Sequence, residues 1–339
     1  MLELAREILA GEEAWVIGGA VRDELLGRPV VDLDIACRDP KAAARAYAGR
    51  TGGASFPLSE RHGAWRVTLD DGRTVDFTPL RDSIEADLAT RDFTINAIAR
   101  PLAGGEDVDP YAGRKDLEER VLRAVQAGIF DDDPLRLLRA VRLEDELGFR
   151  LEPRTERLAR ERAALVARVA GERILGELRR LSVAGWLRLA DVGLLERLDG
   201  SLERADRAAA IDSADYRLVA FLGQAVVQLP ISNELRRFAV ALLRGELPED
   251  GSPRAIHRFR RRTEPWAIEA LALHGRLELA DAVSEARAAD PEEPLVRGDE
   301  LGLPPGPEIG RLLELIAEER ATGTISTREE ALELVRRSR

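Results

Sequence analysis

The chain has 339 residues, of which 33% are charged and 45% apolar, a composition typical of a globular protein with room for two or more domains. Its single cysteine, Cys37, excludes intrachain disulfides and a cysteine-based zinc site, and its three histidines argue against a histidine-rich metal centre or a fused phosphohydrolase. The net charge of −11 counts at first against a nucleic-acid partner, although a local arginine patch can bind phosphate on an acidic protein.

Two further features bear on the location of the protein in the cell. Residues 1–11 are typical of an amphipathic helix containing acids and not of a signal peptide. No apolar run approaches the ~18 residues that a membrane span needs. Together with the single cysteine, these features predict a cytoplasmic protein.

Short strands and helices alternate in the first third of the chain. Runs of β-branched or alternating residues, bounded by Gly or Asp, predict strands at 14–17, 31–36, 65–69 and 74–77, and helices are expected at 20–26 and 40–51. From about Leu117 the strand signals stop, and Leu, Ala, Glu and Arg recur with helical spacing. The predicted fold class is an α/β domain at about 1–125, with a mixed sheet of about five strands, followed by an all-α remainder.

Two carboxylates follow a glycine turn early in the chain. Gly18 and Gly19 come after the first predicted strand, where they let the backbone approach a bulky anion, and Arg22 lies one helical turn further on. Asp32 and Asp34 are two residues apart in the next strand and therefore share one face, where Mg²⁺ would relieve their repulsion. An Asp-x-Asp pattern alone would indicate only a solvated acidic strand face. With Gly-Gly and Arg just upstream, it favours a catalytic site.

This pattern resembles motif A of the class II tRNA nucleotidyltransferases, which are the CCA-adding enzymes, and of the related bacterial poly(A) polymerases. The matching residues are Gly18, Gly19, Arg22, Asp23, Gly27, Arg28, Asp32 and Asp34. The resemblance implies a catalytic head of the polymerase-beta nucleotidyltransferase type at 1–125, a helical neck with a nucleotide-template helix at 126–200, and a helical body and tail that bind RNA at 201–339.

The same resemblance implies the chemistry. Asp32 and Asp34 would hold two Mg²⁺ ions that activate the 3′-hydroxyl of an RNA and stabilise the leaving pyrophosphate. The implied substrates are CTP and ATP, and the implied partner is the 3′ end of tRNA. We expect Gly18, Gly19, Arg22 and Asn96 to bind the triphosphate of the incoming nucleotide. Asp76, in the alternating strand at 74–77, is a candidate third acid, and a solvent-facing strand residue is the equally weighted alternative.

A second polar cluster lies at residues 91–97. In a helix, Asp92 and Asn96 would lie one turn apart on one face, with the carboxylate able to accept from ribose hydroxyls and the amide able to meet phosphate or sugar. Out of context, this would be a capped, half-buried helix. The cluster resembles motif B of the family, which implies that Asp92 with Arg91 binds the ribose and distinguishes it from deoxyribose. Thr90 stands where the family usually has a further arginine.

A third cluster concerns the choice of base. Asp132 or Asp133 can cap a helix, and Asp133, Arg136 and Arg139 then form one polar stripe, which in isolation would be an exposed salt bridge. The run resembles motif D of the family, in which an acid pair and an arginine three residues later act as an amino-acid template. An Asp acceptor beside an Arg donor matches cytosine and adenine and leaves groups unpaired against uracil and guanine. Asp132 replaces the more usual Glu, and Arg139 and Arg142 are expected at nucleotide or RNA phosphates.

The remaining matches are weaker. Residues 109–117 resemble motif C, which reads chemically as a turn between head and neck, and residues 170–178 resemble motif E, whose charged residues we interpret as mainly structural. The densest basic cluster of the helical region is predicted either to contact phosphate or to form a solvated helix face. Its members are Arg254, His257, Arg258, Arg260, Arg261 and Arg262.

Three alternatives to full CCA addition remain open. The connection from Asp76 to Asp92 is short, and Ser83 is predicted to cap a helix within it. Full CCA-adding members of the family usually carry a longer flexible segment there, so the resemblance favours a CC-adding enzyme, unless the connection is only a trimmed surface loop. A poly(A) polymerase shares all the motifs. A catalytically inactive RNA-binding protein is the rival from another class, and the presence of both Asp32 and Asp34 argues against it.

Overall fold

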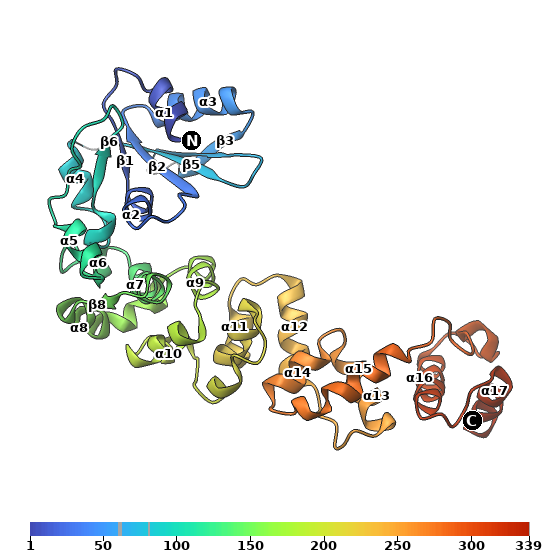
Figure 1. The fold of residues 1–339 in the computed structure, drawn as a ribbon. Helices are drawn as coiled ribbons and strands as arrows, with labels where there is room; N and C mark the ends of the chain where they lie inside the picture. The colour runs from blue at the N-terminus through green and yellow to red at the C-terminus, as the bar shows by residue number, and fades with distance from the viewer. Residues whose placement is uncertain (60–62, 81, 339) are drawn as a thin grey trace. The chain divides into compact units, whose positions relative to one another are not determined.

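The computed structural model describes residues 1–59, 63–80 and 82–338 (Figure 1). For Ser59 it describes the backbone only. The chain divides into two compact units, Met1–Arg197 and Leu198–Arg339. The first unit contains a sheet and the helices that follow it, and the described part of the second unit is built from helices. The predicted fold class is confirmed, whereas the finer division into head, neck and body at 125 and 200 stays a prediction.

A six-stranded mixed sheet forms the centre of the first unit, in the order β3-β4-β5-β2-β1-β6. β2 pairs with β5 in parallel, and the other neighbours are antiparallel. The strands are β1 (Ala14–Ile17), β2 (Asp32–Cys37), β3 (Ala54–Ser59), β4 (Ala64–Thr68), β5 (Thr74–Pro79) and β6 (Ala99–Pro101). β3 and β6 were not predicted, because Pro57 interrupts the pattern of β3 and β6 has only three residues.

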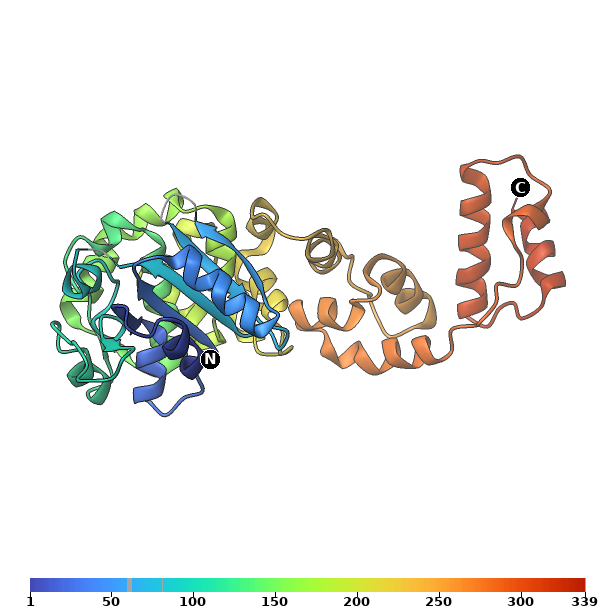
Figure 2. The ribbon, with the colours of Figure 1, turned by 90° about the horizontal axis from the view of Figure 1, so that it is seen from above.

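The two faces of the sheet differ in what covers them. The helix α3 (Pro40–Thr51) lies along one face (Figures 1 and 2), where the Tyr47 ring packs on Phe77 of β5 with centroids 5.8 Å apart. On the same face, two cationic side chains of α3 lie 5.6 and 5.7 Å from the centroid of the Trp65 ring. Because side chains alternate along a strand, Asp34 and Asp76 point to the opposite face.

Short elements border that second face. They are α2 (Gly19–Leu25), α4 (Ile84–Leu88) and the 3₁₀ turn η1 (Thr94–Asn96). The first helix, α1 (Leu2–Ile8), lies instead beside α3 (Figure 1), where the Tyr47 hydroxyl donates to the Met1 carbonyl at 3.2 Å and Arg50 pairs with Glu7. Apolar side chains from α4 and the segment after η1 pack against β1 and β2 in one buried cluster. Its members are Ile17, Ala36, Ile84, Leu88, Ala97 and Ala99. The cap predicted for α4 is present, since the Ala86 N–H donates to Ser83 Oγ at 3.2 Å.

The segment from Asp92 to Asn96 is not the α-helix that we expected. Phe93 is extended and forms a β-bridge with Ala124, and the Thr94 N–H donates to the Arg123 carbonyl at 2.9 Å. These contacts hold the chain extended until the 3₁₀ turn begins. The two polar side chains still meet, because Asn96 Nδ2 donates to Asp92 Oδ1 at 3.0 Å.

Helices dominate the rest of the first unit. They are α5 (Gly113–Glu118), α6 (Ile129–Asp132), α7 (Leu135–Leu147), α8 (Pro153–Arg162), η2 (Ala163–Arg168), α9 (Gly171–Leu178), α10 (Val183–Asp191) and η3 (Glu196–Leu198), whose last residue is the first of the second unit. The expectation that strands end near Leu117 is wrong, because β7 (Val121–Leu122) and β8 (Arg150–Leu151) form a parallel pair. Strands of two residues are too short to produce a detectable alternation.

The second unit consists of short helices with apolar inner faces. They are η4 (Ala205–Arg207), α11 (Ala214–Leu222), η5 (Gly223–Gln228), α12 (Asn233–Arg244), α13 (Pro253–Thr263), α14 (Ala267–Leu273), η6 (Leu277–Leu279), α15 (Ala280–Ala288), η7 (Gly298–Leu301), α16 (Pro307–Ala321) and α17 (Arg328–Arg337). Leu312 and Ile316 of α16 pack with Ala331 and Val335 of α17. Among the described residues no single helix meets the length and hydropathy of a membrane span, and Ala214–Gln228 with Asn233–Arg244 do so only as a pair bent by 117°.

Candidate active site

The glycine turn after β1 brings the backbone close to the acidic part of β2. Gly18 has φ +69°, a conformation that glycine adopts without strain. A Cβ at this position would lie 3.3 Å from Asp34 Oδ2 and 3.5 Å from Arg91 Nη1. In α2, Arg22 is buried and its Nη1 donates to Asn96 Oδ1 at 2.8 Å. The groups that we assign to the triphosphate therefore lie together, and their binding role stays a prediction.

Asp32 and Asp34 share the open face of β2. Asp32 is exposed and accepts a hydrogen bond from Thr74 Oγ1 at 2.7 Å. Burial raises the pKa of Asp34 to about 6; Arg91 opposes this shift, while the carboxylates of Asp76 and Asp32 add to it. The negative charge of Asp34 is therefore poorly stabilised by its surroundings, and a bound cation would stabilise it.

Asp76 lies beside Asp34, since the two are paired in register between β2 and β5. Only 9% of Asp76 is exposed, so the alternative of a solvent-facing strand residue is wrong. Its carboxylate accepts two hydrogen bonds of 2.7 Å from Nε and Nη2 of Arg66 on β4. This bidentate pair fixes Asp76 next to the other carboxylates, while its part in metal binding stays a prediction.

The donor chemistry of this site fits Mg²⁺. Within residues 1–59, 63–80 and 82–338, no group of three or more His, Cys, Asp or Glu side chains is arranged to hold a metal ion. Mg²⁺ is, however, commonly bound by one or two carboxylates and completes its shell with substrate phosphates and water. Asp32 and Asp34 therefore suit an ion that arrives with a nucleoside triphosphate.

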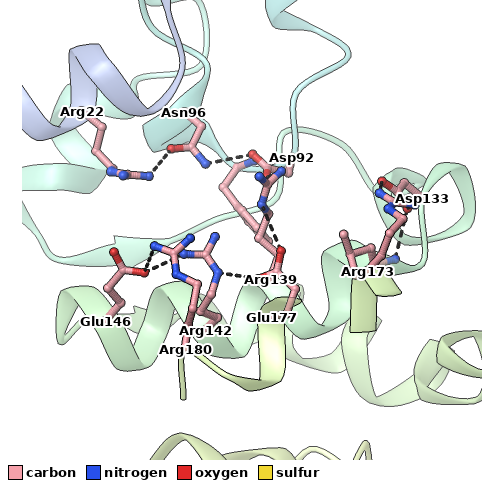
Figure 3. A network of polar contacts seen from close by, with 12 residues as sticks. Arg22, Asp92, Asn96, Asp133, Arg139, Arg142, Glu146, Arg173, Glu177 and Arg180 are labelled. Carbon is pink, nitrogen blue, oxygen red and sulfur yellow. Dashed lines mark hydrogen bonds and ion pairs between the residues drawn. The ribbon is translucent and has the colours of Figure 1, made fainter. Parts of the chain in front are cut away.

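A chain of polar contacts connects the predicted triphosphate and ribose groups (Figure 3). Asp92 is 5% exposed, and its Oδ1 accepts from Asn96 and from the Phe93 N–H, while its Oδ2 accepts from Arg139 Nη1 at 3.2 Å. Burial alone would raise the pKa of Asp92, but the charge of Arg139 and these hydrogen bonds outweigh it and lower the pKa. Asp92 thus carries its charge beside Asn96, which in turn accepts from Arg22, and the charge of Arg139 also acts on Asp34.

The same chain of contacts continues into α9 (Figure 3). Arg139 Nε lies 3.9 Å from Glu177, which also accepts a hydrogen bond from Arg142. Arg142 donates a further bond of 2.6 Å to Glu146, which accepts from Arg180 at 3.0 Å. The Arg142 side chain is only 6% exposed, so this geometry favours a positioning role for it over the phosphate contact that we expected.

The predicted template residues have different partners. Asp132 is an exposed residue at the end of α6, and Asp133 follows it in an extended conformation before α7. Asp133 accepts from the Leu135 N–H, at the start of α7, at 3.2 Å and from Arg173 of α9 at 3.1 and 2.8 Å. Arg136 instead donates to the Thr90 carbonyl at 2.7 Å. Asp133 is therefore not part of the helical stripe, and base selection by Asp132, Asp133 and Arg136 stays a prediction.

The arginines of the basic cluster on α13 are paired with acids. Arg254 contacts Glu318 and Glu319 of α16, and Arg258 contacts Glu318 as well. The other pairs are Arg260 with Glu264 and Asp290, Arg261 with Glu314, and Arg262 with Glu246. The cluster is therefore locally neutralised, which favours the solvated-face interpretation over phosphate binding.

Comparison with known proteins identifies the family. A family model described as the poly A polymerase head domain matches residues 14–83 and 65–123. The chain is 34% identical to the CC-adding tRNA nucleotidyltransferase of Geobacter sulfurreducens, over 95% of this chain and 91% of that protein, and 32% identical to the A-adding tRNA nucleotidyltransferase of Deinococcus radiodurans, over 96% and 95%. The chain belongs to the tRNA nucleotidyltransferase family. The Thermotoga maritima CCA-adding enzyme complexed with tRNA shares its fold, with a TM-score of 0.75 at 24% identity over 99% of this chain and 93% of that one.

Membership confirms the resemblance that the motifs indicated, and it makes this protein an enzyme. Several residues of this tRNA nucleotidyltransferase escaped the sequence reasoning. Arg66 escaped because its partner Asp76 lies ten positions away on another strand. The motif C segment is also more than a turn: a Cβ on Gly113 would lie 2.2 Å from the Thr94 carbonyl oxygen, and buried Asp116 accepts from Thr94 Oγ1 at 2.6 Å. These contacts brace η1 and with it Asn96.

Proposed function

We propose that this tRNA nucleotidyltransferase adds CMP to the 3′ end of tRNA in the cytoplasm. The reaction uses no nucleic-acid template and releases pyrophosphate. In its wider form, the proposal includes addition of AMP as well. The observation that carries the proposal is the pair of carboxylates on β2, Asp32 and Asp34, which lies between the glycine turn at Gly18 on one side and Asp76 of β5 on the other. The relatives named above act on tRNA, which supports the same substrate class here.

Different residues would bind the nucleoside triphosphate and activate the RNA 3′ end. Gly18 leaves room for phosphate beside Asp34, and Arg22 with Asn96 forms a buried polar pair within reach of it. Asp92, fixed in its charged form by Arg139, presents a carboxylate to a ribose hydroxyl. Mg²⁺ held by Asp32 and Asp34 would supply activation of the 3′-hydroxyl and neutralisation of the leaving pyrophosphate.

Base choice would come from protein side chains in place of a template strand. Asp133 is half-buried and held by Arg173, and Arg136 is the second residue of α7. An acceptor and a donor of this kind pair with the edges of cytosine and adenine, and they leave buried groups unpaired against uracil and guanine.

The deciding experiment is product sequencing. A tRNA transcript that ends at its discriminator base is incubated with the enzyme, Mg²⁺ and each nucleotide alone or in combination. CMP incorporation supports the proposal, and incorporation of AMP alone into an unbounded tail would assign a poly(A) polymerase instead. Absence of any metal-dependent pyrophosphate release would assign an inactive RNA-binding protein.

A narrower candidate is CC addition without the terminal A. It is favoured by the short connection between β5, which ends at Pro79, and α4, which begins at Ile84 directly after its cap Ser83. Arg81 lies outside the described residues. Since cytosine and adenine differ in size, a pocket that takes both needs an element that can bias it between two states, and this connection leaves little chain for one. When CTP and ATP are supplied together, products that end in CC support this candidate, and complete CCA ends refute it.

A further inference from the structure

An exposed aromatic residue lies on the sheet face that carries the carboxylates. Phe56 of β3 is 42% exposed. It is paired in register with Arg66 of β4, Arg66 with Asp76 of β5, and Asp76 with Asp34 of β2. Partners in register point to the same face, so these four side chains form one row. Three strand spacings separate its ends, which places Phe56 roughly 14 Å from Asp34.

From Asp34, the row of four side chains runs toward β3, away from the proposed triphosphate site at Gly18. Gly18 follows β1, which borders β2 on one side, whereas β5, β4 and β3 lie on the other. In phosphoryl transfer the attacking and leaving oxygens are roughly in line, with the phosphorus between them. If the triphosphate extends from Gly18 over Asp34, the attacking RNA end lies on the β5 side, toward the row that ends at Phe56.

The chemistry of the row suits a nucleobase. Arg66 is already balanced by Asp76 through two 2.7 Å hydrogen bonds, so this edge offers a ligand mainly apolar surface, from the Phe56 ring and from Leu58, which is 45% exposed. Bases of any sequence stack on such rings, which suits an acceptor whose last base changes with each addition. Pro57 and the shift of pairing between Pro57 and Ser59 protect the edge of β3 against another protein strand.

We propose that Phe56 is a stacking platform for one of the last four nucleotides of the RNA acceptor. The inference rests on the function proposed above and assigns the acceptor side of the same site. About four stacked nucleotides span the roughly 14 Å between the row's ends. Phe56 is thus a positioning residue for the RNA, and Arg66 keeps β4 and β5 aligned beneath it.

Steady-state kinetics with a tRNA lacking CCA provide the first test. Phe56→Ala should raise the KM for RNA roughly 5- to 150-fold, the range expected for loss of one base–aromatic stack, with kcat at saturating RNA and the KM for CTP unchanged. Phe56→Tyr keeps the ring and should behave like the parent. Leu187→Ala, at a side chain 44% exposed on α10, is the matched control and should have no effect.

A second test detects stacking directly. Acceptor RNAs carry 2-aminopurine at each of the last four positions in turn, and quenching on binding is compared between the parent, Phe56→Ala and Phe56→Tyr. Quenching at one position that is lost only in Phe56→Ala supports the proposal. Quenching that is independent of Phe56 at all four positions overturns it, and so does a dimer that Phe56→Ala dissociates in sedimentation, since the ring would then serve self-association. If the parent adds no nucleotide to tRNA, the proposed function itself fails.

Discussion

Two helices of this enzyme are rich in arginine and use it differently. On α7, Arg139 reaches buried Asp92, and Arg142, with a side chain 6% exposed, is enclosed by Glu177 and Glu146. On α13, Arg258 and Arg261 have side chains 62% and 58% exposed and pair with glutamates of α16. The density of arginine along the sequence is therefore a poor guide to the site. Burial alone does not distinguish the two helices, because the side chain of Arg260 on α13 is only 11% exposed and that of Arg139 on α7 is 45% exposed. What distinguishes α7 is that Arg139 binds Asp92, a predicted site residue.

The difference has energetic consequences. A guanidinium enclosed by carboxylates cannot be removed without leaving buried charge unpaired, which is costly. An exposed pair gains little because water and salt screen it. The following experiments test whether the network around α7 and β2 and the surface of α13 differ in this way, beginning with the largest expected effect.

Removal of either carboxylate of β2, Asp34 or Asp32, should have the largest effect on activity. Asp34→Ala and Asp32→Ala should each lower kcat at least about 10³-fold, because metal stabilisation of attacking and leaving oxygens contributes several kcal/mol. Asp71→Ala, in the exposed turn before β5, is the control and should be neutral. Single-turnover CMP addition measures the loss, and thermal melting should show that all three variants fold. Near-parental rates in either site variant would refute the catalytic assignment.

Arg142→Met should destabilise the first unit by about 3–5 kcal/mol, since it leaves Glu177 and Glu146 without their buried partner. Urea unfolding gives the free energy of unfolding. The control is Arg160→Met, whose side chain is 41% exposed in its pair with Glu156. Equal stabilities of the two variants would contradict the distinction between enclosed and exposed pairs. A loss of tRNA affinity without loss of stability would restore the phosphate role for Arg142.

Asp133→Ala should raise incorporation of UMP or GMP relative to CMP by roughly 5- to 100-fold, the range that follows from a buried donor or acceptor left unpaired in the wrong complex. Asp131→Ala, at an exposed residue paired with Arg162, serves as the control. Sequencing of extended tRNA measures the ratio. A variant that binds RNA weakly but keeps its base preference would make Asp133 a helix cap only.

The smallest effect is expected on α13. Arg258→Ala should change the free energy of unfolding by no more than about 1 kcal/mol, because its partner Glu318 keeps Arg254. The affinity for tRNA should also stay near the parental value across a salt titration. A lower salt slope in this variant would show that Arg258 exchanges its glutamate for a phosphate, and the contrast between the two helices would then fail.

Local patterns were enough to predict part of this architecture. Glycine, aspartate and alternation signals predicted β1, β2, β4 and β5, and a serine predicted the start of α4, because these signals depend on neighbours in the chain. β3 and β6 escaped because a proline or extreme shortness removes the alternation. The turn at Asp92 departed from helix because of a bridge from Phe93 to Ala124, which no helical spacing reveals.

The candidate site also has features that local sequence predicts and features that depend on packing. The shared face of Asp32 and Asp34 follows from strand geometry alone, and so could be predicted. The partners of Asp133 and Asp92, which are Arg173 and Arg139, come from other elements and depend on how α7 and α9 pack. The position of an Asp in the sequence does not indicate which arginine will form an ion pair with it. Ion-pair partners that are distant in sequence therefore had to come from the structure.

Cys37 has a practical consequence. It ends β2 with no exposed surface, and burial raises the pKa of its thiol to about 12, so it should resist alkylation in the native protein. As the only cysteine in the chain, it leaves the native enzyme as a ready background for single-site labelling. A cysteine placed at Leu58 on β3, 45% exposed, would carry a fluorophore next to the proposed acceptor path. Nucleotide additions could then be followed one molecule at a time.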